Sequence, residues 1–103
     1  MALSDTPSLT ARSCVVASRD QLSTSLSGEA VILGLRDSVY YGLDGVGAFI
    51  WSRLQTPVAL ADVVEAITRE FDVGVEDATR DLLSLADDLL ARGLLERVPD
   101  AAS

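Results

Sequence analysis

The sequence predicts a small α+β domain in which a three-stranded antiparallel sheet precedes three helices. Two observations lead to this prediction. Short apolar runs separated by polar turns occupy residues 14–43, whereas apolar residues at helical spacing occupy residues 45–93. The chain has 103 residues, of which 49% are hydrophobic, and this is enough for one core and too apolar for a disordered chain. We therefore expect a single folded domain with one site at most.

Three short segments have the composition of strands. The first is the run Cys-Val-Val-Ala at residues 14–17, and the second, residues 30–35, is rich in β-branched and aliphatic residues. The third covers residues 39–43, and Arg-Asp-Ser at residues 36–38 supplies turn-forming side chains between the second and third segments. The last two segments are therefore expected to form a hairpin. The polar stretch at residues 18–29 is expected to be a loop.

Three helices are expected after the hairpin. Asp44 is placed to cap the first, residues 45–54, with its carboxylate accepting hydrogen bonds from the free amides of the first turn. The second helix covers residues 60–71 and keeps its charged residues on one side. The third and longest begins at Glu76 and ends at Gly93, a residue suited to a left-handed C-terminal cap.

The remaining segments frame this domain. Residues 94–98 leave the third helix as a short extended segment, so the folded domain is expected to cover residues 13–98. Residues 1–12 mix Ser, Thr, Pro and Ala without a period and predict a loose arm, and residues 99–103 predict a frayed tail. Three short helices with a small antiparallel sheet have the outline of a winged helix-turn-helix, here with the sheet placed first.

The charge of the chain limits its partners. Eight arginines are scattered among sixteen acidic residues, so the net charge is −8, and lysine is absent. Binding to a nucleic acid backbone or an anionic membrane requires clustered cations, so neither is an expected partner. Neutral or basic peptides and proteins remain. No apolar run is long enough to cross a bilayer and no secretory signal is recognisable, which together predict a cytoplasmic protein.

The sequence lacks most of the side chains that enzymes use. It contains no histidine, the usual general base near neutral pH, and no lysine for Schiff-base or phosphate-loop chemistry. Cys14 is the single cysteine, so neither an internal disulfide nor a structural zinc site can form. The acidic pairs at residues 76–77 and 87–88 lie at helical positions typical of a solvated face. We expect no catalysis and no cofactor.

Two consecutive tyrosines distinguish the third expected strand. Alternation along a strand sends Tyr40 and Tyr41 to opposite faces, so only one of them, Tyr41, can join the core with Leu43. A sheet of three short strands has two edges, and an edge strand offers unpaired amides and carbonyls to an extended peptide. The third helix carries more than one apolar line, so one line can face the other helices and another can border such a peptide.

The segment from Gly28 to Trp51, GEAVILGLRDSVYYGLDGVGAFIW, resembles the PqqD-like family. The resemblance extends over about Val15 to Val98 and is strongest to the branch that serves lasso-peptide biosynthesis. Its most specific parts are Tyr-Tyr-Gly-Leu at residues 40–43, Gly-Ala at 47–48, Ile-Trp at 50–51, and Leu90 with Gly-Leu-Leu at 93–95. The Asp-Gly pair at residues 44–45 stands where the family more often has Asn and a varied residue.

The resemblance implies a recognition protein for ribosomally made, modified peptides. Members of the family bind the leader segment of a precursor as a further strand on the third strand and against the third helix. The partners implied are a leader peptidase of the transglutaminase-like cysteine protease type and a lasso cyclase. The peptide-binding residues expected on these elements are Val39, Tyr40, Tyr41, Gly42, Leu43, Val46, Ile50, Thr79, Leu82, Leu83, Ala86 and Leu90.

Two other functions fit the same fold. A winged-helix DNA-binding regulator needs a basic recognition helix, and the third helix here carries five acidic residues against two arginines, Arg80 and Arg92. A carrier that presents a peptide to a radical SAM enzyme, or a scaffold that only docks a protease, would keep the fold and change the partner. The sign of the charge disfavours the regulator, and the neighbouring genes would separate the others.

Overall fold

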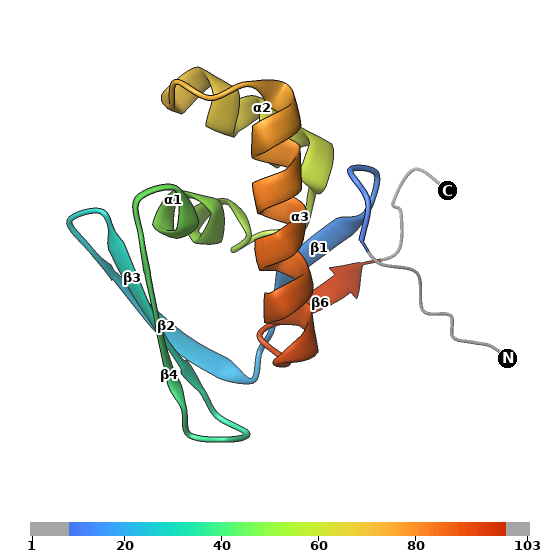
Figure 1. Ribbon diagram of the computed structural model, residues 1–103. Coiled ribbons are helices and arrows are strands. Elements are labelled where there is room, and N and C mark those ends of the chain that lie inside the picture. The colour runs from blue at the N-terminus through green and yellow to red at the C-terminus, as the bar shows by residue number, and fades with distance from the viewer. Residues whose placement is uncertain (1–8, 99–103) are drawn as a thin grey trace, which may run out of the picture.

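A computed structural model of the chain describes residues 9–98 (Figure 1). The described residues form three helices and two three-stranded antiparallel sheets. The strands are β1 (Cys14–Ala17), β2 (Gln21–Leu26), β3 (Glu29–Gly34), β4 (Tyr40–Asp44), β5 (Val58–Ala59) and β6 (Leu95–Val98). The helices are α1 (Gly45–Arg53), α2 (Leu60–Glu70) and α3 (Val75–Ala91). The α+β class is confirmed, and the arrangement is compatible with a winged helix-turn-helix.

The strands divide into two sheets, so the prediction of one sheet that includes residues 14–17 is wrong. The larger sheet has the order β2-β3-β4 and the smaller one the order β5-β1-β6. In the smaller sheet β1 pairs with β6, with Ala17 opposite Leu95, and the two strands lie on the far side of α3 from the larger sheet (Figure 1). Because α3 returns the chain to β1, a tertiary contact decides the partner of this short apolar run.

The third strand of the larger sheet is β2, in the stretch of residues 18–29 that was expected to be a loop. It pairs with β3 over its full length, from Gln21 opposite Gly34 to Leu26 opposite Glu29. Five of its six residues are exposed. A strand exposed in this way needs no buried apolar face, and its sequence has no regular alternation of apolar and polar residues that would identify it as a strand. The joint at residues 27–28 is a two-residue hairpin turn in which both φ angles are positive, 42° and 83°. That Ser-Gly pair is the signal that identifies the hairpin.

The joint between β4 and α1 depends on Gly45. This residue has φ +55°, a conformation that strains other L residues, and it lets the chain pass from an extended strand directly into a helix. Asp44 occupies the N-cap position, but its carboxylate makes no capping hydrogen bond, so that prediction is wrong. Alternation along β4 places the Asp44 side chain on the same face as that of Tyr40, away from the first turn of α1.

The C-terminal end of α3 forms as expected. Gly93 has φ +77° and its N–H donates to the carbonyl of Leu90 at 3.1 Å, while the N–H of Leu94 donates to the carbonyl of Leu89 at 2.9 Å. These two bonds satisfy carbonyls that the end of a helix otherwise leaves without partners. The turn directs the chain into β6.

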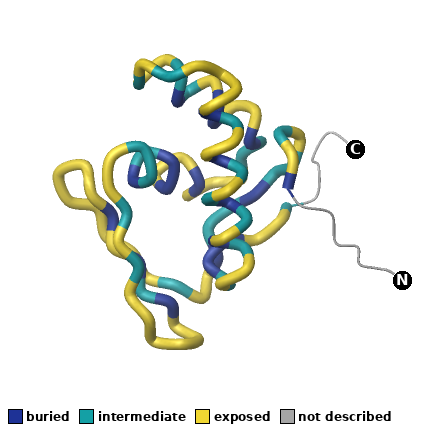
Figure 2. Tube along the Cα trace, in the orientation of Figure 1, coloured by how far each residue is buried: buried dark blue, intermediate teal, exposed yellow. Residues whose placement is uncertain are grey.

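The core lies between the inner face of the larger sheet and the helices, where buried residues gather in Figure 2. Trp51 of α1 is only 1% exposed, and its indole N–H donates to the hydroxyl of Ser23 in β2 at 3.2 Å. Ile32 from β3 and Leu82 from α3 are completely buried. Trp51 therefore fixes α1 against the sheet and orients β2.

The described part of the predicted N-terminal arm, residues 9–12, lies against the domain. Leu9 is 3% exposed and belongs to the core, and its N–H donates to a carboxylate oxygen of Asp87 in α3 at 3.3 Å. The N–H of Ala61 donates to the carbonyl of Ala11 at 2.8 Å. Residues 1–8 and the predicted tail at 99–103 lie outside the described residues.

Candidate functional site: the open edge of β4 and the facing side of α3

Strand β4 is an edge of the larger sheet. It pairs with β3 on one side, and no other strand within residues 9–98 pairs with its second side. Tyr41 and Leu43 are half-buried and face the core, whereas the Tyr40 side chain is 70% exposed on the opposite face of the sheet. The predicted separation of the two tyrosines is confirmed.

The hydrogen-bond ladder shows which backbone groups of β4 are available. The N–H of Gly34 donates to the carbonyl of Val39 at 2.9 Å, so the Val39 carbonyl and both backbone groups of Tyr41 and Leu43 point at β3. The residues between them, Tyr40, Gly42 and Asp44, direct their N–H and C=O groups to the open edge. This edge can therefore form a ladder with one more extended chain.

One side of α3 faces this edge. The guanidinium of Arg92, just after the helix, lies 5.2 Å from the centroid of the Tyr41 ring. Residues 4, 7 and 11 positions before Arg92 share its side of the helix because of the 3.6-residue period, and they are Asp88, Leu85 and Asp81. Together with the edge of β4 they form what we call the β4–α3 site.

An open hollow of about 640 Å³ follows this side of α3. Leu85 supplies its half-buried apolar surface, and carboxylates surround it. The residues that line it are Asp81, Ser84, Leu85, Asp87 and Asp88.

A small polar cluster holds Tyr41 in place. Its hydroxyl donates to one carboxylate oxygen of Asp37 at 3.0 Å, and the N–H of Val39 donates to the other at 3.1 Å. The hydrogen bond from Val39, followed by that from Tyr41, lowers the pKa of Asp37. Contacts with Tyr41 and then with Asp88, which lies 3.2 Å from Arg92, raise the pKa of Arg92. Both groups are therefore charged across the physiological range and fix the ring between strand and helix.

The predicted peptide-binding residues fall into three settings. The fully buried ones are Ile50, Leu82 and Ala86, which lie in the core. The half-buried ones are Tyr41, Leu43, Val46, Thr79, Leu83 and Leu90. The exposed ones are Val39, Tyr40 and Gly42.

Those on α3 are not all on the side that faces β4. Thr79 lines a separate hollow together with Ala61 and Val64 of α2. Leu83 follows Thr79 by one helical turn and shares its side. Leu85, seven residues before Arg92, is the apolar residue on the side of α3 that Arg92 shares. The only sequence signal that Leu85 shares a side of α3 with Arg92 is the helical spacing between them. That spacing identifies the side facing β4 only when the position of β4 is known.

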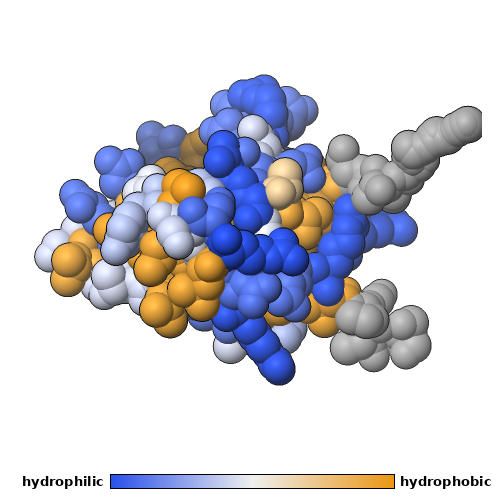
Figure 3. Space-filling view, turned by 90° about the horizontal axis from the view of Figure 1, so that it is seen from below, coloured by the Kyte–Doolittle hydropathy of each residue, from blue (hydrophilic) through white to orange (hydrophobic). Residues whose placement is uncertain are grey.

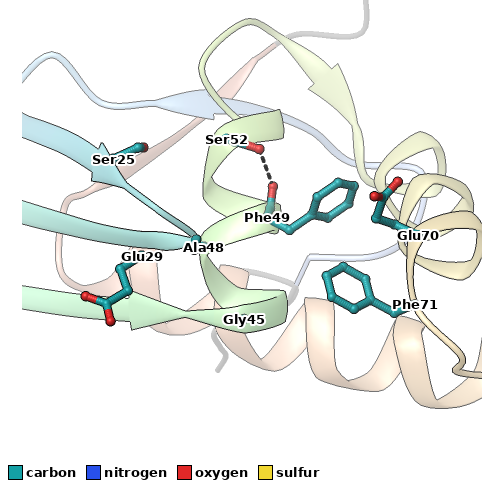
Figure 4. Close-up of a pocket in the computed structure, with 9 residues that line it drawn as sticks. Ser25, Glu29, Gly45, Ala48, Phe49, Ser52, Glu70 and Phe71 are labelled. Atoms are coloured by element: carbon teal, nitrogen blue, oxygen red, sulfur yellow. Dashed lines mark hydrogen bonds between the residues drawn. The ribbon is translucent and has the colours of Figure 1, made fainter.

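Another hollow lies along one side of α1, between the β2–β3 turn and the C-terminal end of α2 (Figure 4). It measures about 460 Å³, and none of the predicted peptide-binding residues lines it. The rings of Phe49 and Phe71 meet edge to face in it, with centroids 5.3 Å apart, and the carboxylates of Glu29 and Glu70 lie at its rim. The remaining lining residues are Ser25, Gly28, Gly45, Ala48 and Ser52.

Within residues 9–98, no group of three or more potential metal-ligating side chains comes together. None of the helices in this part of the chain has the length and apolar character needed to span a membrane.

The fold and the open edge define a class of protein, the small α+β domains that can add an extended peptide to a sheet beside a helix. The chain belongs to the PqqD family, because the family model for coenzyme PQQ synthesis protein D (PqqD) matches residues 29–95, more than half of the chain. The resemblance seen in the sequence is thereby confirmed. No curated protein matches the chain significantly.

Two solved structures are similar to the chain. One is TbiB1 in complex with the TbiA(beta) leader peptide, which is 33% identical, with a TM-score of 0.72, over 82% of this chain and 99% of that one. The other is a lasso peptide synthetase B1 complexed with the leader peptide, which is 27% identical, with a TM-score of 0.65, over 79% of this chain and 95% of that one. Both relatives are almost fully covered, so the likeness extends to the whole domain.

Proposed function

We propose that the protein binds the leader segment of a ribosomally made precursor peptide of the lasso type. The leader pairs as an extra strand with β4 and contacts the facing side of α3. The observation that carries this proposal is the open edge at Tyr40, Gly42 and Asp44, in a chain whose two similar solved structures both hold leader peptides. The backbone ladder supplies affinity that depends little on leader sequence.

Selectivity for particular leaders requires side-chain contacts. Every second residue of an added strand points to the same side of the sheet as Tyr41 and Leu43, where the Arg92 guanidinium lies over the Tyr41 ring. Leu85 is on the side of α3 that Arg92 shares. An apolar or aromatic leader side chain placed there is the expected anchor, and an anchor of this kind contributes about 2 kcal/mol or more to binding.

The charge of the site selects further. Asp44 ends the open strand, and Asp81 and Asp88 line α3 beside it, in a chain with net charge −8. Arg92 is paired with Asp88, so its charge is partly offset. Leaders with Lys or Arg next to the apolar anchor are therefore expected to bind faster at low salt. The preference should weaken as salt is added, because at physiological ionic strength charges more than about 8 Å apart are largely screened.

The proposed role is recognition without catalysis. The protein presents the bound precursor to a separate leader peptidase of the transglutaminase-like cysteine protease type and then to a lasso cyclase, in the cytoplasm. A carrier that serves a radical SAM enzyme would bind a leader in the same way and differ only in the partner enzyme. Reconstitution with the peptidase separates the two, because only the first role predicts faster cleavage of the precursor when the protein is added.

The direct test is calorimetric titration with the leader peptide of the precursor encoded beside the protein. The expected result is a one-to-one complex that forms at micromolar concentrations or below. A scrambled peptide of the same composition is the control for charge alone. No binding of the native leader at tens of micromolar, or equal binding of the scrambled peptide, would contradict the proposal.

A further inference from the structure

Strand β2 is the second open edge of the larger sheet. The strand order β2-β3-β4 in the sheet leaves the outer side of β2 without a partner among the described strands. With six residues, β2 is the longest open edge strand of the two sheets. Open edges are normally protected by charge, proline, a bulge or short length. In the other sheet, β5 has only two residues and β6 contains Glu96 and Arg97. β2 has none of these protections, and its pairing with β3 is continuous.

The ladder again identifies the available groups. The N–H of Leu35 donates to the carbonyl of Asp20 at 2.9 Å, so the Asp20 carbonyl and both backbone groups of Leu22, Thr24 and Leu26 point at β3. Gln21, Ser23 and Ser25 therefore direct N–H and C=O groups outward.

We propose that this edge pairs with β2 of a second copy of the chain, antiparallel and across a two-fold axis at Thr24. In this register Ser23 of each copy exchanges backbone hydrogen bonds with Ser25 of the other, and both are outward-facing residues. The axis makes the contact self-complementary, so it closes after two copies and does not extend along β2.

The same register covers two leucines whose exposure has no other explanation in the single chain. Leu22 is 63% exposed and Leu26 is 65% exposed, both on the face of the sheet that points away from α1. Pairing about Thr24 sets each Leu22 opposite Leu26 of the second copy, in the closer type of antiparallel pair, and sets the two Thr24 side chains against each other.

The face around these leucines is already apolar. Leu22 borders a hollow of about 230 Å³ that is also lined by Val31, Leu33 and Tyr40. Seen from below, apolar side chains gather over the half of the molecule that holds this sheet (Figure 3). Leu26 of the second copy therefore adds to an existing apolar surface.

Charge also favours a second copy at this position. Two chains with a net charge of −8 repel each other, so they approach best through a segment without charge. Residues 21–28, the whole strand and its turn, contain no charged residue. Asp20, just before them, lies 3.6 Å from Arg36 and is partly neutralised.

The dimer leaves the proposed leader edge free. Pairing through β2 gives a six-stranded sheet with one β4 at each end, so leader binding and dimerisation use different strands. One strand pair buries less than the roughly 1,200 Å² of a stable interface, so the dimer should be weak and depend on concentration.

Sedimentation velocity tests this proposal. The wild-type protein should shift from monomer towards dimer between about 10 µM and 1 mM, the range of weak complexes. Ser25→Pro removes an outward N–H from β2 and should stay monomeric throughout. Gly42→Pro makes the same change on the other edge and should dimerise as the wild type does. A wild type that is monomeric at every concentration, or Ser25→Pro that dimerises normally, would overturn the proposal.

Two further variants control for a folding defect in Ser25→Pro and test the pairing register about Thr24. Leu26→Lys changes only an exposed side chain and should also weaken the dimer at least about tenfold, since it faces an apolar partner across a strand pair. In a Cys14→Ala background, Thr24→Cys should form a disulfide dimer, because the two Cα atoms lie about 4.5 Å apart in such a pair. Leu22→Cys should not, and equal cross-linking of both would overturn the proposed pairing.

Discussion

The two open edges of the larger sheet offer the same backbone groups in different surroundings. Beside β4 stands α3, with the Arg92 guanidinium over the Tyr41 ring, whereas the helix contact of β2 is with α1, through the Trp51 indole N–H and the Ser23 hydroxyl. An edge alone pairs with any extended chain, and a neighbouring helix adds the side-chain contacts that select one. The difference indicates that β4 suits a selected peptide and that β2 suits an identical strand.

A proline on β4 should have the largest effect on leader binding. Gly42→Pro removes an N–H that points to the open edge and leaves the bonds to β3, and edge strands tolerate proline in that orientation. We expect leader affinity to fall about 10- to 100-fold, because the leader carbonyl loses its partner and the ladder is interrupted. Calorimetry measures the loss.

Ser25→Pro is the matched control on β2 and should bind the leader with unchanged affinity. Circular dichroism should show both variants folded. If the two prolines weaken binding equally, or neither does, the leader does not pair with β4.

The next effect concerns the two sides of α3. Leu85→Ala should weaken leader binding about tenfold, or about 1.4 kcal/mol, because it removes a half-buried apolar side chain from the side of α3 that carries Arg92. Leu83→Ala truncates the same side chain at similar burial on the side of Thr79 and should change binding little. The sequence alone selected Leu83, so the opposite result would restore the prediction made from it.

A smaller effect concerns β2 as a structural element. Ser23→Ala removes the acceptor of the Trp51 indole N–H, which is part-buried. We expect a loss of about 1 kcal/mol in the free energy of unfolding, typical of a donor left without a partner. Chemical denaturation measures this loss, and leader affinity should stay within twofold. A large loss of affinity would mean that β2 contributes to the leader site.

The smallest effect is that of pH. No histidine is present, so the affinity for a leader without histidine should be constant between about pH 6 and pH 8.5. The pKa of Asp37 is lowered from 3.8, so its contribution to the turn before β4 is complete above that value and is lost as the pH falls through the lowered pKa. Titrations across this range measure the affinity, and a step near neutral pH would contradict the expectation.

Much of the fold could be predicted from local chemistry. Residues 30–35 and 39–43 form a hairpin because β-branched runs flank turn-forming residues, and the helices follow from apolar periodicity. Gly93 ends α3 because the left-handed conformation there requires a glycine. The opposite placement of Tyr40 and Tyr41 follows from the alternation of a strand.

The rest depended on information that no single segment contains. β2 is solvated along its length, so it has no hydrophobic pattern, and its pairing depends on Trp51 and a two-residue turn. The partner of β1 is brought to it by α3. Which side of α3 faces β4 follows from the Arg92–Tyr41 contact, because both apolar lines of the helix are compatible with a core.

Amide hydrogen exchange measured by NMR, with and without the leader, tests the pairing with β4 most directly. At a concentration too low for dimers, the amides of Tyr40, Gly42 and Asp44 should become protected when the leader binds. Those of Gln21, Ser23 and Ser25 should exchange as before. Protection that appears on β2, or a bound leader that leaves the three β4 amides unprotected, would contradict strand addition at this edge.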